Sequence, residues 1–152
     1  MSTHNNPFSP LKLLMATVCL LCYFLTAAVF WILFFWSSNF RLSILNHTVK
    51  FYTGLVAWIL GFKIKTSSHF KKDLKKPALL VSNHLSYTDI LILASQSPMC
   101  FVTSVEMKET MGLGWIVRLA GCLFVERRDK KNIHNEVKEI TEALKSGHHV
   151  VI

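Results

Sequence analysis

The sequence predicts an α/β domain with a mixed or mostly parallel sheet flanked by helices, preceded by a transmembrane helix and an interfacial helix. Three observations lead to this fold class. Short apolar runs alternate with helix-period segments beyond Lys63, no charged residue occurs between Lys12 and Arg41, and one apolar helical stripe lies between these two regions. The 152 residues allow about one domain, and a hydrophobic fraction of 51% is high for a soluble one.

Residues 1–40 are interpreted as a membrane anchor, with the transmembrane segment at about Leu13–Trp36. At ~1.5 Å per helical residue this uncharged run is long enough to cross a ~30 Å hydrocarbon core. A cleaved signal peptide and a buried core helix are the alternatives. Cleavage is disfavoured because the small residues Thr26, Ala27 and Ala28 fall in the middle of the run rather than after it.

The formal net charge of +8 is placed mainly on the C-terminal side of this run, whereas Lys12 is nearly alone on the other side. The positive-inside rule therefore assigns the following domain to the cytoplasm. Most aromatic residues lie in or near apolar segments rather than among the lysines, so we expect membrane lipids and no nucleic acid as partners. A solvated loop is an equally good interpretation of the stretch HFKKDLKKP. The basic residues that follow the run most closely are Arg41, Lys50, Lys63, Lys65, Lys71, Lys72, Lys75 and Lys76.

Residues 41–66 are interpreted as an interfacial amphipathic helix and a linker. Apolar residues recur there at alternating steps of four and three, which is the period of one helical face. The uncharged stretch Phe51–Phe62 is too short to span a bilayer. A helix packed on the soluble domain is the alternative. The stripe consists of Leu45, Val49, Tyr52, Val56 and Ile59.

Residues 67–152 are predicted to form the N-terminal part of the α/β domain. Four apolar runs are predicted strands: Ala78–Val81, Met99–Val102, Cys122–Glu126 and His149–Ile152. The predicted helices between them are Tyr87–Leu93, Lys108–Leu119 and Asn132–Lys145. Gly147 is placed as a helix stop just beyond the last one.

The cysteines and histidines show no metal-ligand spacing. Cys100 and Cys122 are interpreted as small hydrophobic residues in a reducing compartment, and the pair Cys19 and Cys22 lies inside the apolar run. We therefore expect neither a metal nor a disulfide framework.

The stretch VSNHLSYTDI contains the most informative pair of polar residues, His84 and Asp89. In one interpretation Ser86 is a helix N-cap and Asp89, three residues later, completes a capping-box-like arrangement. In the other, Asp89 accepts the Nδ1 proton of His84 and leaves Nε2 as a general base. Because no Ser or Cys stands in a nucleophile-elbow setting, the activated hydroxyl would belong to the substrate, which describes acyl transfer to an alcohol.

Two motifs carry a resemblance to a known family. NHLSYTD resembles the N-H-x-x-x-x-D motif of the glycerolipid acyltransferases, and GCLFVER, Gly121–Arg127, resembles their second motif, G-x-x-F-[IV]-x-R. The ordered pair, the anchor and the lysine-rich approach are together similar to the N-terminal part of a bacterial 1-acyl-sn-glycerol-3-phosphate acyltransferase.

The resemblance implies transfer of a fatty acyl group from acyl-CoA or acyl carrier protein to the sn-2 hydroxyl of lysophosphatidate, giving phosphatidate at the inner membrane. The thioester is a co-substrate, and no other cofactor is implied. By the same resemblance His84 is the base, Asp89 orients it, and Arg127 holds the acceptor phosphate. Gly121 and Phe124 would shape the acceptor site. Strand alternation predicts that Arg127 and Arg128 face opposite sides of the sheet.

The family's third motif, a Glu-Gly-Thr loop, would follow an apolar strand such as HVVI, where this sequence ends. We therefore expect the chain to be the truncated part of a longer acyltransferase. An inactive remnant, or a membrane-anchored lipid-binding module on the same scaffold, is the alternative.

Overall fold

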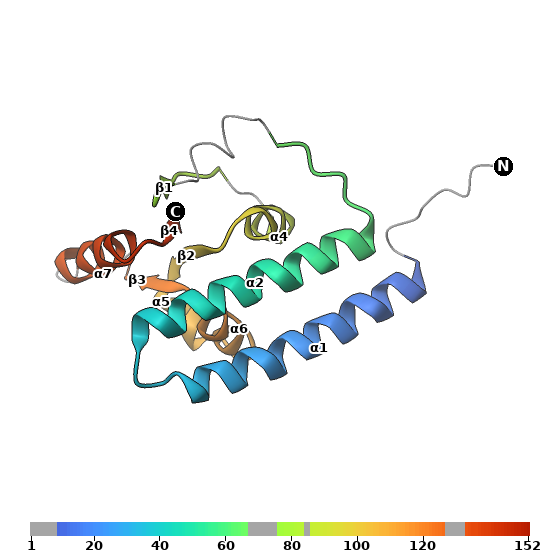
Figure 1. The fold of residues 1–152 in the computed structure, drawn as a ribbon, viewed down its shortest axis with the longest axis horizontal. Coiled ribbons are helices and arrows are strands. Elements are labelled where there is room, and N and C mark those ends of the chain that lie inside the picture. The colour runs from blue at the N-terminus through green and yellow to red at the C-terminus, as the bar shows by residue number, and fades with distance from the viewer. Residues whose placement is uncertain (1–8, 67–75, 84–85, 127–132) are drawn as a thin grey trace.

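The computed structural model describes residues 9–66, 76–83, 86–126 and 133–152 (Figure 1). Two long helices, α1 (Pro10–Leu33) and α2 (Ser38–Leu60), run antiparallel and side by side. A small sheet and one of the shorter helices contact α2, so α2 lies between α1 and the sheet (Figure 1).

The described strands form one parallel sheet in the order β1-β4-β2-β3. They are β1 (Leu79–Leu80), β2 (Met99–Ser104), β3 (Leu123–Val125) and β4 (His149–Val151). Each lies within or overlaps one of the four predicted runs, and the parallel pairing confirms the predicted α/β class. Because all the strands run in one direction, their carboxyl ends share one edge of the sheet.

Between the strands, the described residues form four shorter helices: α4 (Tyr87–Gln96), α5 (Val105–Glu109), α6 (Leu113–Leu119) and α7 (Ile133–Lys145). The prediction of one helix over Lys108–Leu119 is wrong. Gly112, between α5 and α6, has a φ of +82°, and a right-handed helix does not continue through that conformation. Gly147 follows the end of α7 as predicted, with a φ of +94°.

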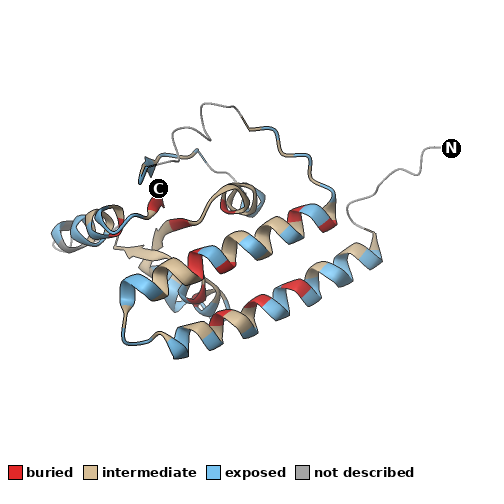
Figure 2. Cartoon of the chain, viewed as in Figure 1, coloured by how far each residue is buried: buried red, intermediate tan, exposed pale blue. Residues whose placement is uncertain are grey.

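The described residues form two hydrophobic clusters, and residues of α2 pack in both. One joins Tyr23 and Ala27 of α1 to Leu45 of α2 and Leu119 of α6. The other is formed under the sheet by Cys100, Ala143 and Val150. Figure 2 shows buried positions of α1 and α2 on the sides where the helices meet their neighbours, with exposed positions facing outward. The stripe residues Leu45 and Ile59 are buried, and α2 packs on both α1 and α4. The interfacial location of this helix stays a prediction.

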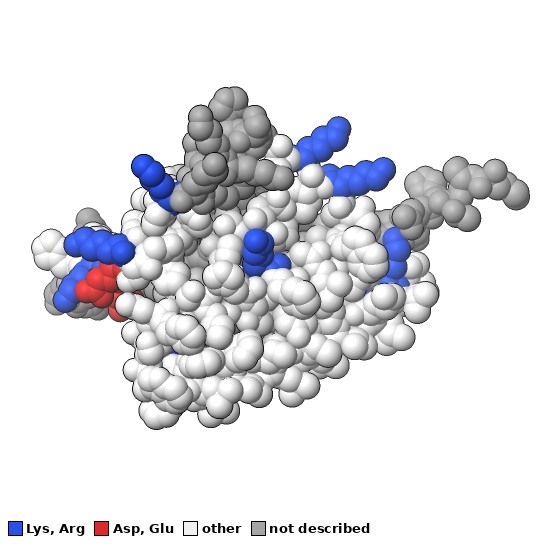
Figure 3. Space-filling view, viewed as in Figure 1, with Lys and Arg blue, Asp and Glu red and all other residues white. Residues whose placement is uncertain are grey.

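Among the described helices, α1 is the one whose length and apolar composition would allow it to cross a membrane, criteria that signal sequences and buried core helices also satisfy. It ends at Leu33 rather than at the predicted Trp36, and it begins at Pro10, which suits a first helical turn because that N–H would have no helical partner. Its buried residues are Cys19, Tyr23 and Ala27. Figure 3 shows a broad uncharged surface in the region of α1, with basic side chains around its borders.

Candidate functional site

The first motif follows the carboxyl end of β1. Beyond the strand, Ser82 N–H donates to Ile152 O at 2.9 Å, so the chain leaves β1 beside the end of β4. Ser86 is extended, with φ −148° and ψ 159°, and it is the N-cap of α4. The chain therefore turns into α4 at the edge of the sheet where the other parallel strands also end.

Asp89 lies in the first turn of α4, and its Oδ2 accepts the Ser86 N–H at 3.0 Å. This bond confirms the predicted capping arrangement. A carboxylate has two oxygens and about four acceptor positions, so one bond to a backbone N–H is compatible with a second bond to an imidazole. Helix capping and base orientation are thus compatible roles for Asp89. His84 lies outside the described residues, and the dyad stays a prediction.

Gly121, the first residue of the second motif, ends α6 with a φ of +67°. Its N–H donates to Arg118 O and that of Cys122 to Val117 O, both at 3.1 Å, which is a Schellman-type helix end. A Cβ at Gly121 would lie 3.1 Å from Leu42 Cδ1 on α2, closer than an ordinary contact. Both the conformation and the close approach to α2 therefore call for glycine. Its role in shaping an acceptor site stays a prediction.

Phe124 is the central residue of β3 and pairs in register with Thr103 of β2. The Lys108 ammonium lies 5.2 Å from the centre of its ring, within the range of a cation–π contact. After the strand, Glu126 N–H donates to the Glu136 carboxylate of α7. Arg127 and Arg128 lie outside the described residues, so their predicted alternation is untested.

The strand order separates the two motifs along one edge. The first motif follows β1 and the second is built on β3, with β4 and β2 between them. Three spacings of about 4.8 Å place the ends of these outer strands roughly 14 Å apart. A substrate held by both motifs would therefore extend across the carboxyl ends of β4 and β2, where parallel α/β sheets commonly bind ligands.

Sequence reasoning missed Asn46, a polar residue of α2 that is only 1% exposed. Its Nδ2 donates to Cys100 Sγ at 3.1 Å, while no described residue bonds its Oδ1. Leaving a buried carbonyl oxygen unbonded costs about 1–3 kcal/mol, so other contacts of the Asn46 side chain must offset this cost. The sequence signal that could have pointed to Asn46 is its polar amide directly after Leu45, a residue of the apolar stripe.

Burial raises the pKa of the Cys100 thiol to about 11, with the hydrogen bond from Asn46 acting in the opposite direction. Burial also raises the pKa of Cys122 to about 12, and the neighbouring Cys100 adds to this shift. Both thiols are protonated at neutral pH. Neutral, buried thiols pack as small hydrophobic residues, which agrees with their interpretation from the sequence.

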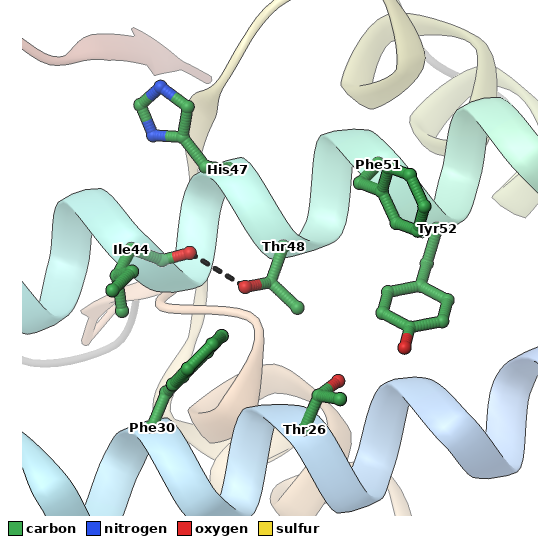
Figure 4. A pocket seen from close by; sticks show the side chains of 7 residues that line it. All are labelled: Thr26, Phe30, Ile44, His47, Thr48, Phe51 and Tyr52. Carbon is green, nitrogen blue, oxygen red and sulfur yellow. Dashed lines mark hydrogen bonds between the residues drawn. The ribbon is translucent and has the colours of Figure 1, made fainter.

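An open groove of about 360 Å³ lies between α1 and α2 (Figure 4). Its two threonine hydroxyls are bonded within their own helices, with Thr48 Oγ1 donating to Ile44 O at 2.8 Å and Thr26 Oγ1 to Cys22 O at 2.9 Å. The groove therefore offers mainly hydrocarbon, although His47 lies at its border. Among the described residues, Asp89, Gly121 and Phe124 are not part of its lining. The lining residues are Thr26, Phe30, Ile44, His47, Thr48, Phe51 and Tyr52.

Comparison with known proteins finds sequence similarity to lipid acyltransferases. The chain is 34% identical over 94 residues to a lyso-ornithine lipid O-acyltransferase of Rhizobium meliloti, covering 62% of this chain and 32% of the relative. It is 31% identical over 97 residues to a probable 1-acyl-sn-glycerol-3-phosphate acyltransferase of Mycoplasma genitalium, covering 59% and 35%. A lysophosphatidylcholine acyltransferase of Drosophila melanogaster is 29% identical over 70 residues, covering 46% and 13%.

The chain thus spans about a third of the length of the bacterial relatives. No solved structure matches it. The Acyltransferase family model matches residues 61–152, which contain both motifs and every strand described above. With more than half of its length matched in this way, the chain belongs to the Acyltransferase family.

Proposed function

We propose that the protein is a membrane-associated lysolipid O-acyltransferase. It transfers a fatty acyl group from the thioester of coenzyme A or acyl carrier protein to a hydroxyl of a lysolipid. The observation that carries this proposal is the position of Asp89. The first-motif carboxylate is fixed by Ser86 in the first turn of α4, at the carboxyl edge of a parallel sheet.

In the proposed mechanism His84 acts through Nε2 while Asp89 holds Nδ1–H. Nε2 takes the proton of the lysolipid hydroxyl, and the oxygen attacks the thioester carbonyl carbon. The tetrahedral intermediate then expels the thiolate, which takes the proton back from the imidazolium. Atoms balance with an ester and a free thiol as products.

For the acceptor we propose lysophosphatidate, acylated at its sn-2 hydroxyl. Arg127 stands in a cationic run with Arg128, Lys130 and Lys131, and a guanidinium fork suits a phosphate. A lyso-ornithine lipid is the second candidate, because relatives with that name are 34% and 30% identical to this chain over 94 and 103 residues. Ornithine supplies amino and carboxyl groups in place of phosphate, so the two acceptors need different partners.

The test is an acyl-transfer assay in membranes that contain the protein. Labelled acyl-CoA and acyl carrier protein would each be offered with lysophosphatidate and with a lyso-ornithine lipid. Product from lysophosphatidate supports the full proposal, and product from the lyso-ornithine lipid alone replaces the acceptor. The absence of any product above that of the His84→Ala variant would favour the inactive or lipid-binding alternative.

We further propose that the protein resides in the inner membrane with its α/β part on the cytoplasmic side. Support comes from the length of α1 and from the basic residues that follow it, such as Arg41, Lys63 and Lys65. Alkaline carbonate should leave the protein in the membrane pellet. Release of the chain by carbonate would show that α1 does not anchor it.

A further inference from the structure

Three elements meet at the buried side chain of Asn46. Its Nδ2 donates to Cys100 Sγ at 3.1 Å, and Cys100 Sγ donates in turn to Gly121 O at 3.6 Å. Asn46 belongs to α2, Cys100 to β2, and Gly121 is the first residue of the second motif. A continuous hydrogen-bonded path therefore runs from the long helix pair to the start of that motif.

The side chain of Asn46 also lies close to Gly121. A Cβ at Gly121 would stand 3.2 Å from Asn46 Oδ1 and 3.5 Å from Leu45 Cβ. The backbone of the motif thus rests against α2 at one turn of that helix. A shift of α2 by a few tenths of an ångström must be taken up at Gly121 or at Cys100, because both are buried.

The segment beyond Gly121 is short and held at both ends. β3 has three residues, paired with Val102, Thr103 and Ser104 of β2. At its far end the Glu126 N–H is bound by the Glu136 carboxylate of α7. Such a short segment has little length over which to absorb a displacement, so the position of Gly121 bears on that of Glu126, the residue that precedes Arg127 in the sequence.

We infer that Asn46 is a positioning residue that couples the seating of α2 to the acceptor-binding end of the second motif. The inference rests on the proposed function, in which Arg127 holds the acceptor. It assigns Asn46 no contact with substrate. Substitution of Asn46 should lower the affinity for the lysolipid. Binding of the thioester and the rate of the chemical step should stay nearly unchanged.

The variant Asn46→Leu tests this, since it keeps a similar volume and removes both polar atoms. Thr48→Val is the matched control. Thr48 is also buried on α2, at 8% exposure, but its hydroxyl donates within the helix to Ile44 O and reaches neither β2 nor Gly121. Cys100→Ala is a second route to the same defect if Asn46→Leu does not fold. Cys100→Ser should keep the hydrogen-bonded path, because a hydroxyl can both accept and donate.

Two measurements are needed. Hydrogen exchange of peptides over residues 121–126 should become about threefold faster or more in Asn46→Leu and in Cys100→Ala, and stay unchanged in Thr48→Val. The Kd for lysophosphatidate in nanodiscs and the KM for the same acceptor should rise about tenfold in the first two variants, with kcat and the thioester KM within about twofold of wild type.

The outcomes separate this inference from the proposed function. Unchanged exchange over residues 121–126 overturns the inference whatever the activity, and so does unchanged lysophosphatidate binding despite faster exchange. An equal effect of Thr48→Val also overturns the inference, because the loss of any buried polar group of α2 would then have the same result. Absence of acyl transfer by the wild-type protein overturns the proposed function alone, since binding and exchange still decide the role of Asn46.

Discussion

The helix pair α1–α2 and the carboxyl edge of the sheet treat their polar groups in different ways. In the helix pair, the hydroxyls of Thr17, Thr26 and Thr53 donate to carbonyls three or four residues back in the same helix, at 2.7 to 3.2 Å. At the sheet, bonds join separate elements, as Glu126 does with Glu136 and Ser82 with Ile152.

In terms of the proposed function, the helix pair is suited to membrane attachment and the sheet edge to substrate recognition. A hydroxyl bonded to its own helix presents its methyl or methylene side outward, so the helix pair keeps an apolar surface despite its threonines. Bonds between elements instead fix the direction of polar groups at the sheet edge. We therefore expect substitutions at the edge to alter catalysis without loss of stability. Substitutions of buried apolar residues in the helix pair should do the reverse, whereas Asn46, which bonds to β2, is an exception within that pair.

The largest expected effect is on rate. His84→Ala should lower acyl transfer by roughly 10²–10⁴-fold, as is typical for loss of a general base, with little change in the thermal unfolding midpoint. His134→Ala is the control, since His134 is exposed on α7. Equal losses in both variants, measured as kcat/KM in membranes, would contradict the role of His84.

The corresponding effect in the helix pair is on stability. Leu45 is 2% exposed in the cluster that joins α1, α2 and α6, and Leu45→Ala should lower the free energy of unfolding by about 2–5 kcal/mol. Activity per folded molecule should change little. Leu55→Ala is the matched control on the same helix, because Leu55 is 36% exposed. A similar loss for both leucines in detergent unfolding curves would mean that burial against α1 and α6 does not stabilise α2.

Asp89→Asn separates the two roles of Asp89. An asparagine side chain keeps an oxygen that can accept the Ser86 N–H, but it loses the charge that stabilises an imidazolium. Activity should fall about tenfold or more, while the unfolding midpoint stays close to that of the wild type. Full activity in Asp89→Asn would leave the residue with its capping role alone.

A smaller effect is expected at the acceptor. Arg127→Ala should raise the KM for lysophosphatidate about tenfold, through loss of a charge-assisted contact worth ~1.5–3 kcal/mol. Arg128→Ala should do much less, because an exposed charge contributes ~1 kcal/mol at most. Steady-state kinetics with varied acceptor would decide. A larger effect at Arg128 would show that the strand register or the motif assignment is wrong.

The strands were the most predictable part of the fold, since buried parallel strands appear as short continuous apolar runs such as MCFV and HVVI. Helix ends were less predictable because hydropathy does not register backbone conformation. The break at Gly112 depends on a positive φ, and α1 stops at Leu33 although apolar residues continue to Trp36. Tertiary contacts were also hard to predict. α2 contacts neighbouring elements on both of its sides, and a single apolar stripe in the sequence does not reveal this.

For the site, the motif pattern identified Asp89 because the carboxylate and its capping partner lie three residues apart. It could not identify Asn46, since its partners Cys100 and Gly121 are distant in sequence and the distances appear only once the chain is folded. Local motifs are visible in a sequence, whereas buried polar contacts between elements require the packing.

The strand order also has a consequence for biosynthesis. β4 follows the other described strands in the chain, yet it lies between β1 and β2 and is the strand that joins them. During translation the α1–α2 pair, whose contacts are close in sequence, can form early, whereas the sheet must wait for His149–Val151. Until then the facing edges of β1 and β2 lack their partner and are open to pairing with other chains. A ribosome that pauses before residue 149 therefore holds a nascent chain whose two motifs stand on separate, unjoined parts of the sheet.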